Sequence, residues 1–138
     1  MANPLVELGQ YGQSPWLDNI SRGLITSGQL QTLIDEDGLK GVTSNPAIFE
    51  KSITGSTDYD AAIEQLASQN KTAMAIYEAL AIDDIQNAAD VLRSVYEKTN
   101  GRDGFISLEV SPYLANDTDG TIEEARRLWQ AVDRNNVM

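Results

Sequence analysis

The chain has 138 residues, no cysteine and no histidine, and its 21 acidic residues outnumber its 10 basic ones, giving a formal net charge of −11 at pH 7. This composition excludes disulfides, thiolate metal sites and histidine as a general base. It also disfavours nucleic acid and anionic membranes as partners, because both would repel the chain. The length and the 41% hydrophobic content predict a single domain over residues 1–138. Without a membrane-length apolar run or a secretory amino terminus, a cytoplasmic protein is expected.

The first half of the sequence alternates short strands with helices. A short helical or irregular lead precedes a first strand near Trp16–Ile20, which carries one acid, and an apolar spacing then predicts a helix over 29–35. Gly38 ends that helix before a second strand at 41–43, and Pro46 opens a short helix through Lys51. The order is β, α, β.

The second half begins with a helical block. A helix capped at Thr57–Asp58 runs to about Gln69, and residues 71–100 are predicted to form two helices that break near residues 81–84. Gly101 to Gly104 close the block, and a third strand follows over residues 105–110. The apolar spacing of residues 121–133 predicts a further helix, and residues 136–138 resemble the start of a fourth strand.

Strands separated by helices predict a parallel α/β sheet with right-handed crossovers, in which the carboxyl ends of the strands gather on one side. Asp18, Thr43, Asn45 and Glu109 all lie at or near such ends. A surface position or a helix cap explains Asp18 equally well. Glu109 is flanked by Leu108 and Val110, so strand alternation turns it away from its apolar neighbours and favours a functional role.

The segment GVTSNPAIF at residues 41–49 is the most informative motif. Pro46 fits the first position of a helix and holds the preceding Asn45 extended, with its carboxamide at the end of the strand. The same pattern also serves simply to stop a strand and cap a helix. Local sequence alone leaves both interpretations open.

This motif resembles the first signature of the transaldolase family. Further similarity lies in SPWLDNISRGLI at residues 14–25 and in FISLEVSPYLANDT at residues 105–118, and it extends over residues 3–138. The resemblance implies the amino-terminal part of a transaldolase: the first three β/α units of a (β/α)8 (TIM-type) barrel and the start of strand four. It also implies transfer of a dihydroxyacetone unit between sugar phosphates through a Schiff base, in the pentose phosphate pathway and with no cofactor.

The resemblance assigns roles to four residues. Asp18 matches the family's acid/base for carbon–carbon bond cleavage and formation, and Glu109 matches the carboxylate that assists imine formation through a water. Asn45 would hold the dihydroxyacetone hydroxyls, with Thr43 supporting the same wall.

The family's Schiff-base lysine lies in strand four, in a stretch resembling NVMIKIPAT, whereas this sequence reads only as far as NVM. No lysine present matches it; they are Lys40, Lys51, Lys71 and Lys98. The 138-residue chain is therefore expected to be inactive alone.

Two alternatives come from other classes of protein. The DTDGT segment that begins at Asp117 resembles the magnesium-dependent motif of haloacid-dehalogenase-type phosphatases, with Asp117 and Asp119 as the acids, but a loop leading into a helix explains it more simply. The chain would otherwise be a non-catalytic half-barrel that assembles with another chain. Uncovered barrel edges would also allow a homo-oligomer or a complementary fragment to dock.

Overall fold

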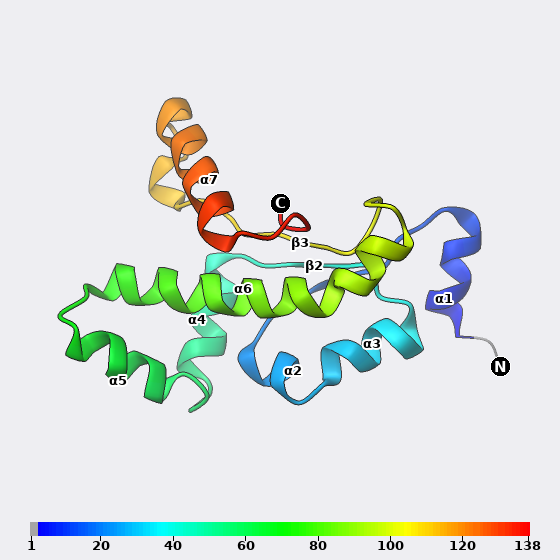
Figure 1. Cartoon of the computed structure of the whole chain (residues 1–138), viewed down its shortest axis with the longest axis horizontal. Helices are drawn as coiled ribbons and strands as arrows, with labels where there is room; N and C mark the ends of the chain where they lie inside the picture. Colours follow the sequence, from blue (N-terminus) through cyan, green and yellow to red (C-terminus); the bar gives the residue numbers. More distant parts are fainter. Residues whose placement is uncertain (1–2) are drawn as a thin grey trace.

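Three short parallel strands lie at the centre of the molecule, and helices α2 to α6 are layered along one side of them (Figure 1). The computed structural model describes residues 3–138, so residues 1 and 2 of the predicted domain lie outside the described part. The elements in chain order are α1 (Pro4–Leu8), the 3-10 turn η1 (Gly9–Tyr11), β1 (Trp16–Asp18), α2 (Arg22–Thr26), α3 (Gln29–Asp37), β2 (Gly41–Thr43), α4 (Pro46–Thr54), α5 (Asp60–Ser68), α6 (Ala73–Lys98), β3 (Phe105–Ile106), η2 (Pro112–Leu114) and α7 (Thr118–Val132).

The strands pair in the order β1-β2-β3, and both pairings are parallel. Asp18 lies opposite Thr43, and Val42 lies opposite Ile106. An isolated parallel bridge joins Ile106 to Val137, within the stretch where the sequence predicts the start of a fourth strand. The α/β class with a parallel sheet is therefore confirmed, and in residues 3–138 the sheet is open rather than closed into a barrel.

Helix α6 is one continuous helix of 26 residues, so the predicted break near residues 81–84 is wrong. That stretch contains neither proline nor glycine. Its mixed polarity has another cause, because Ala81 and Ile85 pack into the core while Asp84 enters a buried polar network.

Several further boundaries differ from the sequence prediction. Strand β1 ends at Asp18 rather than Ile20, and α4 runs on to Thr54 rather than Lys51. Helix α5 begins at Asp60 with Tyr59 as its N-cap, so the predicted cap at Thr57–Asp58 is wrong. Strand β3 ends at Ile106 rather than at residue 110, although its extended backbone continues, since the Leu108 amide donates to the Met138 carbonyl at 2.8 Å. Helix α7 starts at Thr118 rather than Thr121, because the Asp117 carboxylate accepts a hydrogen bond from the Gly120 amide and caps the helix.

The hydrophobic core lies between the strands and the helical layer. Val42 and Ile106 are fully buried and pack with the apolar face of α6, including Ile85, Ala88 and Leu92. The core residues of the other helices are Leu24, Leu30, Phe49 and Val132. One face of the sheet therefore carries the main apolar packing, and the helices do not cover the other face.

A buried polar network ties α2 and the start of α5 to α6. Asp84 is 1% exposed, accepts a hydrogen bond from the Tyr59 hydroxyl at 2.7 Å and is 2.9 Å from Arg22 Nε. The Arg22 amide donates to the same hydroxyl at 2.9 Å, and the Arg22 guanidinium lies over the Tyr59 ring. Because every charged member has a partner, the network avoids the cost of an unpaired buried charge.

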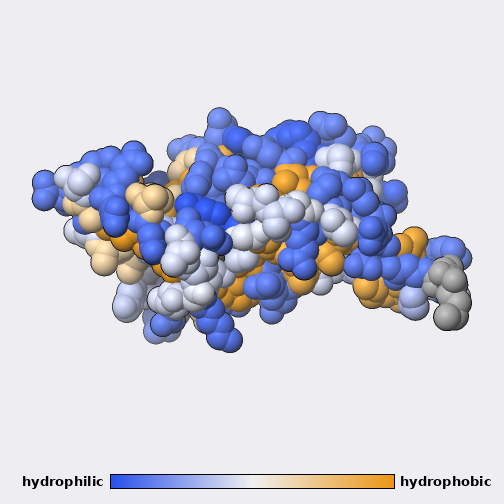
Figure 2. Space-filling view, turned by 90° about the horizontal axis from the view of Figure 1, so that it is seen from below, coloured by the Kyte–Doolittle hydropathy of each residue, from blue (hydrophilic) through white to orange (hydrophobic). Residues whose placement is uncertain are grey.

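The face of the molecule seen in Figure 2 is mostly hydrophilic. Figure 2 views the helical layer from below and shows apolar atoms gathered mainly in patches between polar side chains and around α1, where Leu5 and Val6 are exposed. None of the helices formed by residues 3–138 combines the length and the apolar character needed to cross a bilayer.

Candidate active site

The candidate site lies on the face of the sheet turned away from the helices. Val42 and Ile106 point into the core, so strand alternation directs Thr43 and Ser107 to the opposite, open face. Leu17 also packs against the core, which directs Trp16 and Asp18 to that same face. The Trp16 ring covers Gly41, where any side chain would collide with the indole. The open face thus presents polar groups at the carboxyl ends of its strands.

Asp18 and Thr43 are in direct contact there. The Thr43 hydroxyl donates a hydrogen bond of 2.7 Å to Asp18 Oδ1, across the register that pairs the two residues. Asp18 is exposed and Thr43 is half-buried. The hydroxyl orients the carboxylate on one oxygen and leaves the other oxygen open to solvent or to a ligand.

Asn45 has the conformation that the sequence predicts. Its backbone is extended, with φ −152° and ψ 167°, and Pro46 is the first residue of α4. Asn45 Oδ1 accepts a hydrogen bond from the Ile48 amide at 2.9 Å and caps the helix. Helix capping uses only the oxygen. In residues 3–138 no hydrogen bond involves the Asn45 amide nitrogen, so two donors remain available beside the site.

Ser107 is a site residue that the sequence analysis missed. It follows Ile106 and lies beside Thr43 on the open face, and its hydroxyl oxygen accepts a hydrogen bond from the Ser44 amide at 3.0 Å. Ser44 itself is buried, and its hydroxyl donates to the Ser107 carbonyl at 2.7 Å. The period-two spacing of residues 105, 107 and 109 was the signal that could have placed Ser107 on the same face as Glu109.

Glu109 lies beyond β3, on the extended segment that leads to η2. It is exposed rather than buried. It borders a cavity of about 370 Å³ that Pro46, Tyr77 and Met74 also line. Burial and, to a smaller extent, the nearby Glu109 carboxylate raise the pKa of Tyr77 above its ordinary value of 10.0. No hydrogen bond among the described residues joins Glu109 to Asp18, Thr43 or Asn45.

The described residues contain no group of three or more histidine, cysteine, aspartate or glutamate side chains arranged to hold a metal ion. Asp117 caps α7, and Asp119 lies in its first turn. The phosphatase alternative needs its first aspartate at the end of a buried strand, and Asp117 does not occupy such a position.

Two of the four lysines lie at the amino ends of the strands, and the other two lie in the helical layer. Lys40 precedes β2, and its carbonyl accepts a hydrogen bond from Gly104 at the amino end of the sheet. Lys98 closes α6 at that same end, and Lys71 lies in the turn between α5 and α6, at the far end of the helical layer in Figure 1. Lys51 is exposed on α4. Among residues 3–138, no hydrogen bond or ion pair joins a lysine to Asp18 or Thr43, which bond each other.

A parallel α/β sheet with polar side chains gathered at its strand ends defines the class of α/β enzymes that bind ligands at that edge. A sequence model described as "Transaldolase/Fructose-6-phosphate aldolase" matches residues 15–138. The chain therefore belongs to the transaldolase/fructose-6-phosphate aldolase family.

Individual relatives agree with the family match. The chain is 50% identical over 136 residues to transaldolase 2 of Nostoc punctiforme, which covers 99% of this chain and 36% of the relative. It is 49% identical to the transaldolase of Trichodesmium erythraeum, over 100% of this chain and 36% of the relative. The transaldolase of Thiobacillus denitrificans is 47% identical over 96% of this chain and 37% of its own length. The chain thus spans little more than a third of these relatives and corresponds to the amino-terminal portion of a transaldolase.

Proposed function

We propose that this chain carries the amino-terminal part of a transaldolase active site, built on the first units of a (β/α)8 barrel. The complete enzyme would transfer a dihydroxyacetone unit from a ketose phosphate to an aldose phosphate through a Schiff base, in the cytoplasmic pentose phosphate pathway. The observation that carries this proposal is the 2.7 Å contact between Thr43 and Asp18 on the open face of a parallel sheet, in a chain of this family.

Asp18 is the proposed acid/base. Cleavage of a carbon–carbon bond next to a hydroxyl requires removal of the hydroxyl proton, and the reverse reaction returns it. A carboxylate held by one hydrogen bond from Thr43, with its second oxygen free, can perform both steps. The contact to Thr43 supports this role because it fixes the direction of that second oxygen.

Glu109 is the proposed partner of a catalytic water. Imine formation first gives a carbinolamine, which loses its hydroxyl as water when that hydroxyl gains a proton and the nitrogen lone pair forms the C=N bond. A carboxyl group acting through a bound water can deliver this proton. The exposure of Glu109 beside the cavity that Pro46 and Tyr77 line supports a role through water rather than by direct contact.

Asn45 and Thr43 are proposed to bind the hydroxyls of the dihydroxyacetone unit. The Asn45 amide nitrogen is the donor left over after its oxygen caps α4, and it lies directly after the strand end that carries Thr43. Ser107 adds a further hydroxyl to the same wall. Together they would orient a polyhydroxylated substrate by several hydrogen bonds.

The amine of the Schiff base would come from outside the 138 residues. Imine chemistry needs a primary amine beside the carbonyl, and the positions of Lys40, Lys51, Lys71 and Lys98 support none of them in that role. The chain alone is therefore proposed to be inactive.

A chimera tests the proposed function. Residues 1–138 replace the matched segment of the Nostoc punctiforme transaldolase 2, whose remaining length completes the chain. We expect the chimera to exchange three-carbon units between sugar phosphates in a coupled assay, because the proposed acid, water-binding and hydroxyl-binding groups are all present. A folded chimera with no exchange activity would contradict the proposal.

Matched variants of the chimera separate catalysis from folding. Asp18→Asn and Glu109→Gln should each lower kcat by about 10²-fold to 10⁴-fold, the usual contribution of a positioned acid or base. Asp119→Asn, at an exposed aspartate of the phosphatase-like segment, should leave the rate unchanged. Equal effects at Asp119 and Asp18 would contradict the assigned roles.

A further inference from the structure

At the carboxyl ends of β2 and β3, serine side chains replace a backbone hydrogen bond of the ladder. The Ser107 amide donates to the Val42 carbonyl at 3.0 Å, and in a regular parallel pair the Ser44 amide would next donate to the Ser107 carbonyl. Instead, the Ser44 amide donates to the Ser107 hydroxyl at 3.0 Å, and the Ser44 hydroxyl donates to the Ser107 carbonyl at 2.7 Å. We call these two hydrogen bonds the serine clamp.

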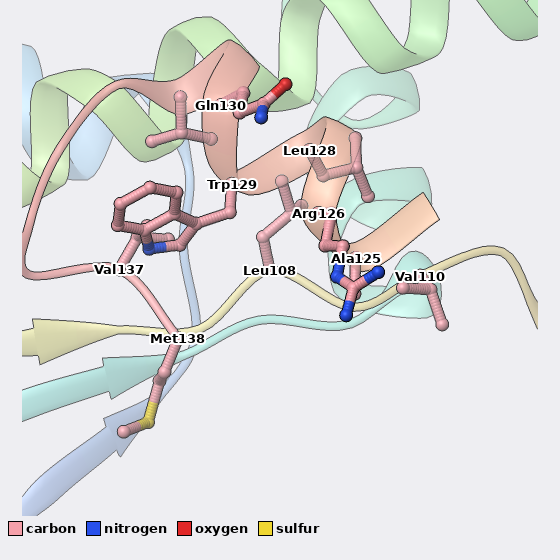
Figure 3. A pocket seen from close by; sticks show the side chains of 10 residues that line it. Leu108, Val110, Ala125, Arg126, Leu128, Trp129, Gln130, Val137 and Met138 are labelled. Carbon is pink, nitrogen blue, oxygen red and sulfur yellow. The ribbon is translucent and has the colours of Figure 1, made fainter. Parts of the chain in front are cut away.

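Ser44 and Ser107 reach each other from different sides of the sheet. Ser44 is 2% exposed and shares the core side of β2 with Val42. Ile106 is fully buried, and Figure 3 shows the Leu108 side chain directed towards α7, so alternation turns Ser107, which lies between them, to the open face. The serine clamp therefore connects the buried side of β2 with the face that carries the candidate site.

The serine clamp allows β2 to turn away from β3 while the two backbones stay joined. Ser44 is followed directly by the extended Asn45 and by Pro46, the first residue of α4, so the chain changes from strand to helix within two residues. A hydrogen bond made through a side chain spans a wider gap than one between two backbone groups. Because Ser44 lies between Thr43 and Asn45, holding Ser44 in place limits the movement of both neighbours.

The serine clamp also orients the Ser107 hydroxyl. Its oxygen accepts the Ser44 amide, so its own proton stays available, and no hydrogen bond within residues 3–138 uses that proton. The Asn45 amide nitrogen is likewise a free donor there, because only the Asn45 oxygen caps α4. Two donors at the ends of neighbouring strands suit a ligand that carries several hydroxyls.

We propose that Ser44 is a positioning residue of the candidate site. Its hydroxyl and its amide hold Ser107 and Asn45 in the relative arrangement that orients the hydroxyls of a sugar phosphate. Ser44 is buried, so it acts through these two residues and does not contact the substrate. The effect on the substrate rests on the proposed function, whereas the placement of Asn45 does not.

Thr99 provides a matched control, because it has the same chemistry at the other end of the sheet. Its half-buried hydroxyl accepts a hydrogen bond from the Asp103 amide at 3.0 Å and donates to the Val95 carbonyl at 2.9 Å, just before β3 begins. Thr99→Ala therefore removes at least as many hydroxyl–backbone hydrogen bonds as Ser44→Ala does. It leaves the carboxyl ends of the strands unchanged.

Hydrogen exchange of the full 138-residue chain, followed by NMR, tests the placement without any turnover. The Ile48 amide reports on Asn45, because it donates to Asn45 Oδ1 at 2.9 Å. In Ser44→Ala we expect the Ile48 amide to exchange about tenfold faster relative to the Leu92 amide in the core of α6, because Asn45 then shifts. Thr99→Ala should change this ratio by less than about twofold.

Ser107→Ala reaches the serine clamp from the open face and keeps the test valid even if Ser44→Ala does not fold. This variant removes the acceptor of the Ser44 amide and leaves the Ser107 carbonyl in place. The Ser44 and Ile48 amides should then exchange about tenfold faster, again relative to Leu92. Unchanged exchange at both amides would overturn the proposal.

Steady-state kinetics of the chimera separate positioning from a loss of folded protein. Partial unfolding lowers the amount of active enzyme and hence the apparent kcat, but it leaves KM unchanged. Misplaced hydroxyl-binding groups weaken substrate binding, so Ser44→Ala should raise KM for the ketose phosphate by about tenfold. Thr99→Ala should leave KM within about twofold.

Two further results would overturn the proposal. One is a rise in Ile48 exchange that is equal in Ser44→Ala and Thr99→Ala, because the serine clamp would then serve stability alone. The other is an active Ser44→Ala chimera with unchanged KM. An unmodified chimera without activity counts against the proposed function only, because the Ile48 measurement decides the placement of Asn45 independently.

Discussion

Tyr59 joins three parts of the chain through one hydroxyl group. The hydroxyl donates to Asp84 on α6 and accepts from the Arg22 amide at the start of α2, while its ring supports the Arg22 guanidinium. Burial, and then the hydrogen bond to Asp84, raise the pKa of Tyr59 above its ordinary value of 10.0. The hydroxyl therefore remains a protonated donor at neutral pH.

Tyr59→Phe removes that donor without removing the ring. Because the Asp84 oxygen and the Arg22 amide then lose a buried partner, we expect the free energy of unfolding to fall by about 1–3 kcal/mol. Urea denaturation followed by circular dichroism measures the change. Tyr113→Phe, at an 86% exposed tyrosine, is the control and should change stability by less than about 0.5 kcal/mol. Equal stabilities of Tyr59→Phe and the unmodified chain would contradict the role given to the network.

Local sequence could predict site residues whose position depends on their immediate neighbours. The extended backbone of Asn45 and the helix start at Pro46 follow from proline geometry, and both are confirmed. The contact between Asp18 and Thr43 depends on the register of β1 and β2. The sequence predicted only that both residues lie at the same edge of the sheet. Contacts such as Tyr59 with Asp84, 25 residues apart, carry no local signal, so the buried network was missed.

At the scale of elements, α7 is held to α6 by one well-formed ion pair. Both nitrogens at the end of the Arg127 side chain bond Glu78, at 2.7 and 2.6 Å. The hydrogen bond from Arg127 lowers the pKa of Glu78 below its ordinary value of 4.5. A carboxyl group whose pKa is lower in the folded state stabilises the fold above its unfolded pKa and loses this contribution as the pH falls through the folded pKa.

Glu78→Gln should therefore destabilise the chain only where Glu78 is ionised. The side chains are 35% and 51% exposed, so we expect a loss of about 0.3–1 kcal/mol at pH 7. The difference from the unmodified chain should disappear as the pH falls below 4.5 and through the folded pKa. Urea unfolding at a series of pH values measures it. Glu97→Gln is the control in the same helix, because Glu97 forms no ion pair within the described chain. A loss at Glu78 that is independent of pH would contradict the assignment.

Elements were predictable where their signals were local, and their ends were not. Gly38 and Pro46 correctly indicated the end of α3 and the start of α4, whereas the predicted cap at Thr57–Asp58 was wrong. The length of β3 depends on its neighbours, because a strand ends where its ladder partners end. For this reason β3 covers only Phe105–Ile106 of the strand predicted over residues 105–110. Helix α6 is continuous because Ala81 and Ile85 pack into the core. The mixed polarity of residues 81–84 gave no sign of this packing in the sequence.

At the scale of the whole molecule, the chain is an open parallel sheet with one apolar and one polar face. The apolar face is covered by helices, and the polar face carries Asp18, Thr43 and Ser107 at the strand ends. In the proposed function these groups serve a Schiff base whose amine belongs to another part of the enzyme. The arrangement explains why a chain with acids and amides in place has no lysine beside them.

Borohydride trapping with a ketose phosphate donor tests this account most directly, with the adduct located by peptide mass spectrometry. The isolated 138-residue chain should give no covalent adduct, and the chimera with the Nostoc punctiforme relative should be trapped on a lysine that lies outside residues 1–138. An adduct on Lys40, Lys51, Lys71 or Lys98, or a folded chimera that is not trapped at all, would contradict it.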